Sequence, residues 1–84
     1  MTREEIKTVL VEELGRIAPE ADPGALSSEA DIREELDIDS FDFQNLIIAL
    51  AERLQLDIPE RDYPKLQIFG KALDYLEAAA AARG

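Results

Sequence analysis

One serine of the chain lies among carboxylates, at a point where a loop is expected to become a helix. The stretch that contains it reads Asp37-Ile38-Asp39-Ser40-Phe41-Asp42-Phe43. Charged residues and turn formers precede Ser40, and the strongest helical pattern of the chain follows it. A serine in this position can be a nucleophile, a helix cap or a residue that another enzyme modifies, and acidic neighbours can bind metal ions. The surrounding residues bear on each of these roles.

Autonomous catalysis by Ser40 is not supported by the residue types of the chain. A catalytic serine needs a general base within hydrogen-bond reach and donors that stabilise an oxyanion. The sequence has no histidine, and no Gly-x-Ser-x-Gly motif surrounds Ser40. Asp39 and Asp42 place negative charge beside the hydroxyl, which opposes formation of an alkoxide. We therefore expect that the protein is not an enzyme.

The acidic residues near Ser40 do not match a metal-binding loop. A calcium loop that began at Asp37 would have Phe41 at a ligand position and Asp42 at the glycine position. Its last position, which requires a bidentate glutamate, would be Ile48. The sequence also has no cysteine, so thiolate zinc sites and disulfides are excluded. We expect no dedicated metal site.

The composition predicts one small acidic domain. With 84 residues, of which 46% are hydrophobic, the chain can form a single core, and we expect one domain over residues 1–84. The formal net charge of −10 disfavours binding to nucleic acid, which depends on Lys and Arg displacing counterions. No apolar run approaches the roughly 20 residues that span a bilayer, and the charged N-terminus lacks a signal-peptide core. Because cysteine is absent, we expect a cytoplasmic protein.

Apolar residues at helical spacing predict an all-α fold, a small four-helix bundle of three longer helices and one short helix. Thr2 begins a capping-box pattern that opens the first helix, and Pro19 marks the end of that helix. The long connection over 20–39 is expected to be a packed loop. Ser28 together with Asp31 can open a single helical turn within it.

The second longer helix is expected to start at residue 40 or 41 and to end at residue 54. The last helix carries Phe69, Ala72, Leu73 and Leu76 on one face and continues through the alanines, with fraying around Gly84. Between them, 60–66 can form only a short helix, in which Pro64 is tolerable only near the first turn. The apolar residues expected in the core of the longer helices are Ile6, Val9, Leu10, Leu14, Ile17, Phe43, Leu46, Ile47, Leu50, Leu54, Phe69, Ala72, Leu73 and Leu76.

Two large apolar residues of the second longer helix, Phe41 and Ile48, do not belong to its core stripe. Apolar residues on the flank of a helix are often partly buried. The alternative is a small exposed apolar strip on which partner proteins dock. On the residues alone, both interpretations stay open, and a helix cap is the simplest interpretation of Ser40.

The tetrapeptide Asp39-Ser40-Phe41-Asp42, the apolar helix after it and the later Ile58-Pro59-Glu60 together resemble the acyl carrier protein family. That family has an Asp-Ser-Leu-Asp motif at the start of its second helix. Leu36 and the segment Ala72-Leu73-Asp74-Tyr75-Leu76 extend the resemblance over nearly the whole chain. The resemblance implies that Ser40 is esterified by 4′-phosphopantetheine, which a phosphopantetheinyl transferase takes from coenzyme A. The arm would carry acyl intermediates of fatty-acid, lipid or related biosynthesis as thioesters.

The resemblance also implies which residues meet partner proteins. Phe41 and Ile48 fall on apolar docking positions of the second helix, and Asp39, Asp42 and Glu52 fall on acidic ones. The implied partners, besides the transferase, are acyl-loading and acyl-processing enzymes with basic, partly apolar docking patches. We expect the carrier to be a monomer.

Several residues depart from the pattern of the family. Asp37 replaces a common glycine, and Phe41 replaces the usual leucine. Asn45 and Ala51 stand where acidic residues are expected, and Ile68 stands where a threonine commonly starts the last helix. These departures predict a specialised carrier with its own partners.

Two alternatives stay open at this point. The first is an aminoacyl or peptidyl carrier, although peptidyl carriers usually have a histidine before their serine. The second is an unmodified acidic helical interaction module with Ser40 as a cap, which a kinase could phosphorylate.

Overall fold

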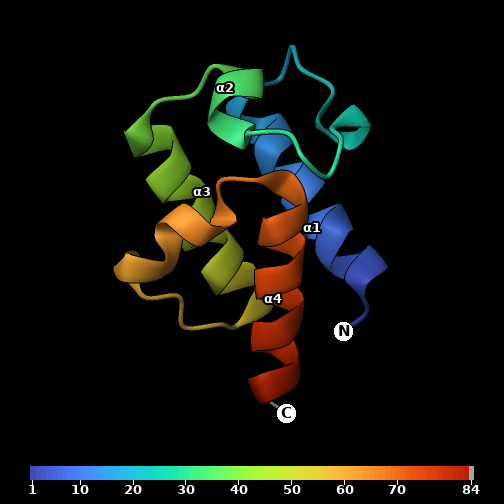
Figure 1. Ribbon diagram of the computed structural model, residues 1–84, viewed down its shortest axis with the longest axis vertical. Coiled ribbons are helices and arrows are strands. Elements are labelled where there is room, and N and C mark those ends of the chain that lie inside the picture. Colours follow the sequence, from blue (N-terminus) through green and yellow to red (C-terminus); the bar gives the residue numbers. More distant parts are fainter. Residues whose placement is uncertain (84) are drawn as a thin grey trace.

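Four α-helices and two 3₁₀ helices follow one another along residues 1–83, the part of the chain that the computed structural model describes (Figure 1). Gly84, near which we expected fraying, lies outside the described residues. The all-α bundle predicted from the periodicity is confirmed. The elements are α1 (Arg3–Ile17), η1 (Pro23–Ala25), α2 (Ile32–Leu36), α3 (Ser40–Leu54), η2 (Glu60–Leu66) and α4 (Phe69–Arg83).

The capping box predicted at the start of α1 is confirmed. Oγ1 of Thr2 accepts a hydrogen bond from the backbone N–H of Glu5 at 3.2 Å, and Oε1 of Glu5 accepts from the N–H of Thr2 at 2.8 Å. The helix ends at Ile17, just before Pro19. Two backbone donors that would otherwise have no partner are thus satisfied, and the start of α1 is well defined.

The helical turn expected at Ser28 begins later, and it is a five-residue α-helix. Asp31 is its N-cap, because Oδ1 of Asp31 accepts from the N–H groups of Arg33 and Glu34 at 3.0 and 3.2 Å. Ser28 has a different role, since its carbonyl accepts from the N–H of Gly70 at 2.8 Å. A hydrogen bond from the Gln67 side chain lowers the pKa of Asp31, so the capping carboxylate stays charged.

The short helix over 60–66 is a 3₁₀ helix, and Pro64 lies inside it rather than near its first turn. The expectation for Pro64 was therefore wrong. A 3₁₀ turn needs only one bond between residues three apart. Pro64 supplies the acceptor of such a bond, from the N–H of Gln67 to its carbonyl at 3.3 Å, and needs no N–H of its own.

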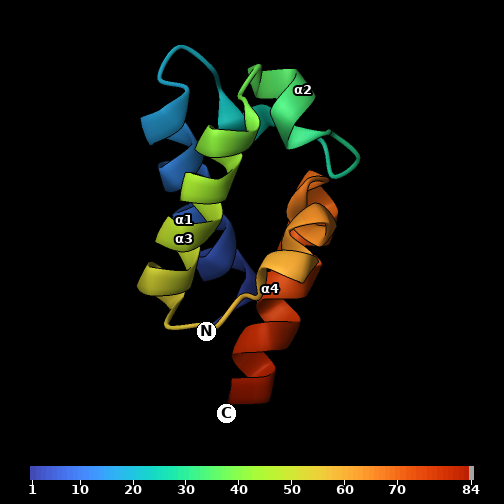
Figure 2. The ribbon, with the colours of Figure 1, turned by 90° about the vertical axis from the view of Figure 1, so that its left-hand side faces the viewer.

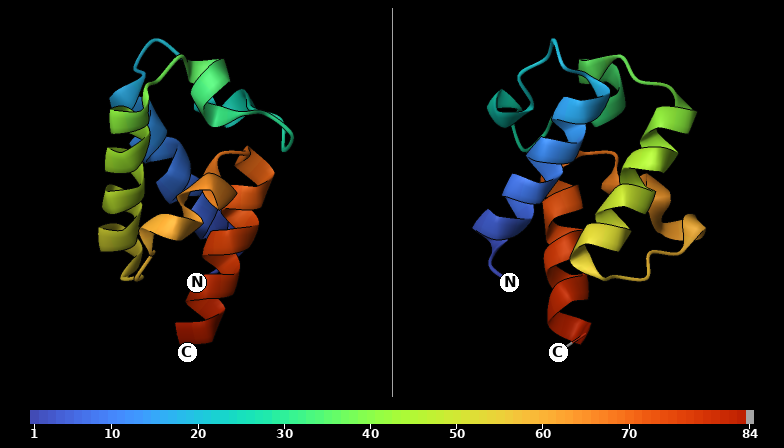
Figure 3. Two further views of the ribbon diagram at one scale, coloured as in Figure 1. Left: turned by 60° about the vertical axis from the view of Figure 1, so that its left-hand side comes forward. Right: turned by 180° about the vertical axis from the view of Figure 1, so that it is seen from behind.

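Helix α1 packs against both α3 and α4, and η2 packs against α4 (Figures 2 and 3). The first residues of α3 lie at the same end of the bundle as α2, opposite to the chain termini (Figure 1). Of the predicted core residues, Val9 and Ile17 are half-buried and the others are buried. The core also contains Ala18, Ile32, Ile38, Ile58 and Leu66.

The connection between α1 and α2 is held against the start of α4, as expected of a packed loop. The N–H of Ile32 donates to the carbonyl of Gln67 at 2.8 Å, and the N–H of Phe69 donates to that of Ala30 at 2.9 Å. A Cβ atom on Gly70 would lie 2.8 Å from the carbonyl oxygen of Ser28. Only glycine allows this approach.

A hydrogen bond joins α4 to η2. The hydroxyl of Tyr75 donates to Oδ2 of Asp62 at 2.6 Å. Burial of the phenol, followed by this bond, raises the pKa of Tyr75 to about 12. The same bond is the main cause that lowers the pKa of Asp62. The contact therefore stabilises the fold only while Tyr75 is protonated and Asp62 is ionised.

Tyr75→Phe is expected to remove the alkaline pH dependence of stability and to weaken the acidic one, which Lys65 also supports through its ion pair with Asp62 at 3.2 Å. Because the folded-state pKa of Asp62 is depressed, its contribution is present above the ordinary value of 3.8 and is lost as the pH falls below it. Because the folded-state pKa of Tyr75 is raised, its contribution is complete below pH 10.0 and is lost as the pH rises to about 12.

Urea unfolding of wild type and Tyr75→Phe over this pH range tests the prediction. Tyr63→Phe is the matched control, because the Tyr63 hydroxyl bonds no side chain or backbone group of residues 1–83. This control should keep the pH dependence of the wild type. Identical pH profiles for the two variants would contradict the assigned role of the contact between Tyr75 and Asp62.

Candidate functional site

Ser40 is the first residue of α3, and the cap of that helix is Asp39. Oδ1 of Asp39 accepts a hydrogen bond from the N–H of Asp42 at 2.8 Å, and its carbonyl accepts from the N–H of Phe43 at 3.0 Å. The interpretation of Ser40 as the cap was therefore wrong by one residue. Ser40 is exposed, and its hydroxyl bonds no group within residues 1–83. The side chain is left available for a reaction that another enzyme carries out.

Negative charge is favoured beside the Ser40 hydroxyl. The backbone N–H groups of Ser40 and Phe41 have no acceptor among the described residues, as is usual in the first turn of a helix. These donors and the dipole of the 15-residue helix attract an anion to this end. A phosphodiester on Ser40 would lie in that favourable field.

The apolar residues that we predicted outside the core stripe of α3 are exposed. Phe41 has 74% of its surface exposed and Ile48 has 43%, whereas Ile47 has 1%. The partly buried interpretation was therefore wrong for Phe41, whereas Ile48 is exposed along one side and covered on the other. Asn45 and Glu52 are exposed as well, at the intermediate positions of the same helical face.

We call this face, formed by Phe41, Asn45, Ile48 and Glu52, the outward face of α3. It combines two apolar side chains with one acid, and it begins directly beside Ser40. Asp39 and Asp42 add two exposed carboxylates at its start. The structure thus brings the predicted partner-binding residues onto one side of the molecule together with Ser40.

A cleft of about 240 Å³ opens beside Ser40, between α2, α3 and η2. The cleft is small, and the one buried side chain in its lining is that of Phe43. Its lining includes one cation, Arg33, which the sequence analysis missed. The lining residues are Arg33, Ser40, Phe43, Gln44, Glu60, Tyr63, Pro64 and Gln67.

One signal for Arg33 was present in the sequence. It is the only basic residue between Arg16 and Arg53, in a segment that contains ten acidic residues. A cation isolated among acids can mark a local function. The hydrophobic pattern contains no such information, and the cleft forms only when η2 packs near α2.

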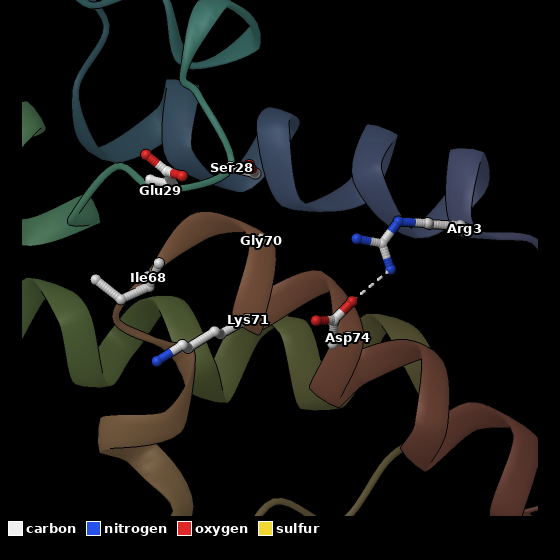
Figure 4. Close-up of a pocket in the computed structure, with 7 residues that line it drawn as sticks. All are labelled: Arg3, Ser28, Glu29, Ile68, Gly70, Lys71 and Asp74. Carbon is white, nitrogen blue, oxygen red and sulfur yellow. Dashed lines mark hydrogen bonds and ion pairs between the residues drawn. The ribbon is translucent and has the colours of Figure 1, made fainter.

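Two cavities larger than this cleft contain little of the predicted site. One of them, of about 460 Å³, lies between the loop before α2 and the first turns of α1 and α4 (Figure 4). None of the predicted site residues lines it, and its Arg3 is paired with Asp74 at 2.8 Å. A shallow cavity of about 420 Å³ at the end of α3 includes Glu52.

Within residues 1–83, no three His, Cys, Asp or Glu side chains are grouped so that they could hold a metal ion. None of the helices in this part of the chain has the length and apolar character needed to cross a membrane. The acidic residues around Ser40 are spread along the helix end and the loop before it.

Comparison with known proteins places this geometry in a family. The family described as phosphopantetheine attachment site matches residues 4–68, from the first turn of α1 to just beyond η2. The acyl carrier protein of Bdellovibrio bacteriovorus is 35% identical over 72 residues, which cover 86% of each chain. The chain belongs to the acyl carrier protein family. A second acyl carrier protein, from Campylobacter concisus, is 34% identical over 74 residues, which cover 88% of this chain and 90% of the relative.

The fold agrees with the family. The solved structure of the acyl carrier protein from Enterococcus faecalis superimposes with a TM-score of 0.74 at 25% identity. The match covers 94% of this chain and 99% of that one. The predicted acyl carrier resemblance, the small helical bundle and the phosphopantetheine cofactor are thereby confirmed. The role of such a protein is to carry acyl groups, not to catalyse reactions.

Proposed function

We propose that Ser40 is the residue to which 4′-phosphopantetheine is attached. The observation that carries this proposal is the exposed hydroxyl of Ser40 at the first position of α3. Asp39 caps the helix, so the Ser40 hydroxyl is not used as the cap. Ser27 and Ser28 are the other serines, and both lie in the loop before α2 rather than at a helix start. The unmodified interaction module loses its main support, because it required Ser40 as the cap.

The residues around Ser40 fit the prosthetic group. The free N–H groups at the start of α3 suit a phosphodiester, with an effect of roughly 0.3–1 kcal/mol at an exposed helix terminus. When bound, the arm supplies the thiol on which acyl groups are carried as thioesters, and the chain has no cysteine that would compete for them. The protein holds and presents the arm.

We propose that the outward face of α3 is the surface that partners recognise. Phe41 and Ile48 provide apolar contacts, and Asp39, Asp42 and Glu52 attract basic residues. The phosphopantetheinyl transferase and the acyl-loading and acyl-processing enzymes would meet this face with basic, partly apolar patches. At the centre of the face, Asn45 stands where the family usually has an acidic residue. This difference supports a specialised carrier with its own partners.

Further features of the carrier belong to the same proposal. We expect residues 1–84 to function as one domain and as a monomer in the cytoplasm. The net charge of −10 supports partners that are basic proteins rather than nucleic acids.

The proposed function is tested by loading the protein. Wild type is incubated with coenzyme A and a broad-specificity phosphopantetheinyl transferase, and its intact mass is expected to rise by one phosphopantetheine group. With acetyl-coenzyme A as the donor, the mass should also include an acetyl group that hydroxylamine removes, as a thioester requires. An established acyl carrier protein serves as the control. If the control is modified and this protein is not, the proposed function is wrong.

A further inference from the structure

Arg33 has an unusual environment for an arginine. The side chain is half-buried, and its Nε atom is buried without a hydrogen-bond partner among the described residues. Arg33 also forms no ion pair with a carboxylate of residues 1–83. By contrast, the guanidinium groups of Arg3, Arg53 and Arg83 donate hydrogen bonds of 2.7–2.8 Å.

A buried donor without an acceptor is costly, because it has lost its water and gained nothing in return. The acids near Arg33 in the sequence do not satisfy it, since neither Glu34 nor Glu35 forms an ion pair with it. Asp31 is occupied by Gln67 and by two backbone N–H groups, and the charge of Arg33 adds only a smaller contribution to lowering the pKa of Asp31. An anion supplied from outside the chain would give the guanidinium a partner through its terminal N–H groups, because Nε itself is closed to solvent.

The cleft determines where that anion would lie. Arg33 from α2 and Ser40 from α3 line the same cleft of about 240 Å³. Any group on the Ser40 oxygen begins at this cleft. A phosphodiester has two unesterified oxygens that share one negative charge, and the planar fork of an arginine matches such a pair better than a lysine does.

We propose that Arg33 binds the phosphodiester of the arm on Ser40. Arg33 then holds the start of the arm against the cleft between α2, α3 and η2. This inference rests on the proposed attachment at Ser40. Glu60 lines the cleft from η2 and opposes an anion, but it is exposed and its charge is screened by solvent, whereas Arg33 is half-buried.

The test follows the Nε–H group of Arg33 by NMR in ¹⁵N-labelled protein before and after loading. The resonance is assigned by its loss in Arg33→Gln. On loading with coenzyme A, we expect this resonance to shift and its exchange with water to slow about tenfold, as for a charge-assisted hydrogen bond at the low end of its strength. The phosphorus resonance of the loaded arm should differ between wild type and Arg33→Gln.

Arg61→Gln is the matched control. It makes the same change in charge at an exposed arginine of η2 that does not line the cleft. We expect loading to raise the urea midpoint of wild type and of Arg61→Gln by the same amount, and to raise that of Arg33→Gln by less. Comparing apo and loaded forms of each variant separates this effect from any loss of stability that the substitution itself causes.

The outcomes distinguish this inference from the proposed function. A mass gain without a change at Arg33 would overturn the inference and leave attachment at Ser40 intact. If the mass of wild type does not rise, both the attachment at Ser40 and the role of Arg33 are overturned. The experiment is repeated with arms that carry an acetyl or a succinyl group. A shift seen only with the succinyl arm would assign Arg33 to the carboxylate of the cargo and overturn the phosphodiester assignment.

Discussion

Replacing Ile47 by alanine is expected to lower the free energy of unfolding by about 2–5 kcal/mol, whereas replacing Ile48 should change it by less than about 1 kcal/mol. The two residues are neighbours of the same type on α3. Ile47 is 1% exposed and Ile48 is 43% exposed. Removing the Ile47 side chain leaves a cavity in the packed core, while the Ile48 side chain borders solvent and its removal leaves no enclosed cavity.

Urea unfolding at neutral pH measures both values from the midpoint and the slope. An unchanged slope shows that the unfolded state is the same for each variant. Equal losses at Ile47 and Ile48 would mean that Ile48 packs as a core residue. The outward face of α3 would then lose one of its two apolar side chains.

Phe41→Ala is expected to lower kcat/KM of the phosphopantetheinyl transferase by roughly 10- to 150-fold. This range corresponds to the roughly 1.5–3 kcal/mol gained when a large apolar side chain is buried, here against a partner. Phe41 is 74% exposed in the free protein and follows Ser40 directly, so an enzyme that acts on Ser40 must approach it. Because Phe41 is exposed, its removal should leave the free energy of unfolding nearly unchanged.

Phe41→Leu is the matched variant, because it restores the residue that is usual in the family and keeps an apolar side chain. It should retain most of the activity of the wild type with the transferase. Steady-state kinetics with coenzyme A and each variant as the varied substrate gives the comparison. If Phe41→Ala is loaded as fast as wild type, the transferase does not use this side chain.

The longer helices could be predicted from the sequence because the signals that define them lie within each helix or at its ends. In α1, α3 and α4, apolar residues recur at the helical period over 15 residues each, and caps or prolines mark the ends of α1. The five-residue α2 has no such pattern. It depends on the Asp31 cap, which is held by Gln67, 36 positions away in the chain. Such a contact exists only after the chain has folded.

The departure at Asp37 has a physical explanation that the sequence did not show. Asp37 ends α2 in the left-handed conformation, with φ of 52° and ψ of 49°. Glycine adopts this conformation at no steric cost, and aspartate is one of the few other residues that tolerate it. The replacement of the family's glycine therefore preserves the turn that leads into α3.

The site itself was only partly predictable. Asp39 and Ser40 are both good cap residues, so a shift of one position could not be decided from residue types. The structure gives the cap to Asp39. Arg33 was missed because its importance lies in the cleft between α2, α3 and η2, which no sequence pattern encodes.

The most direct test of the account is the identity of the residue that accepts the arm. The chain has three serines, Ser27, Ser28 and Ser40, so two variants cover them all. After incubation with coenzyme A and the transferase, the double variant Ser27→Ala/Ser28→Ala should gain one phosphopantetheine group in intact mass, as wild type does, and Ser40→Ala should gain none. A full mass gain in Ser40→Ala would contradict the assignment of Ser40.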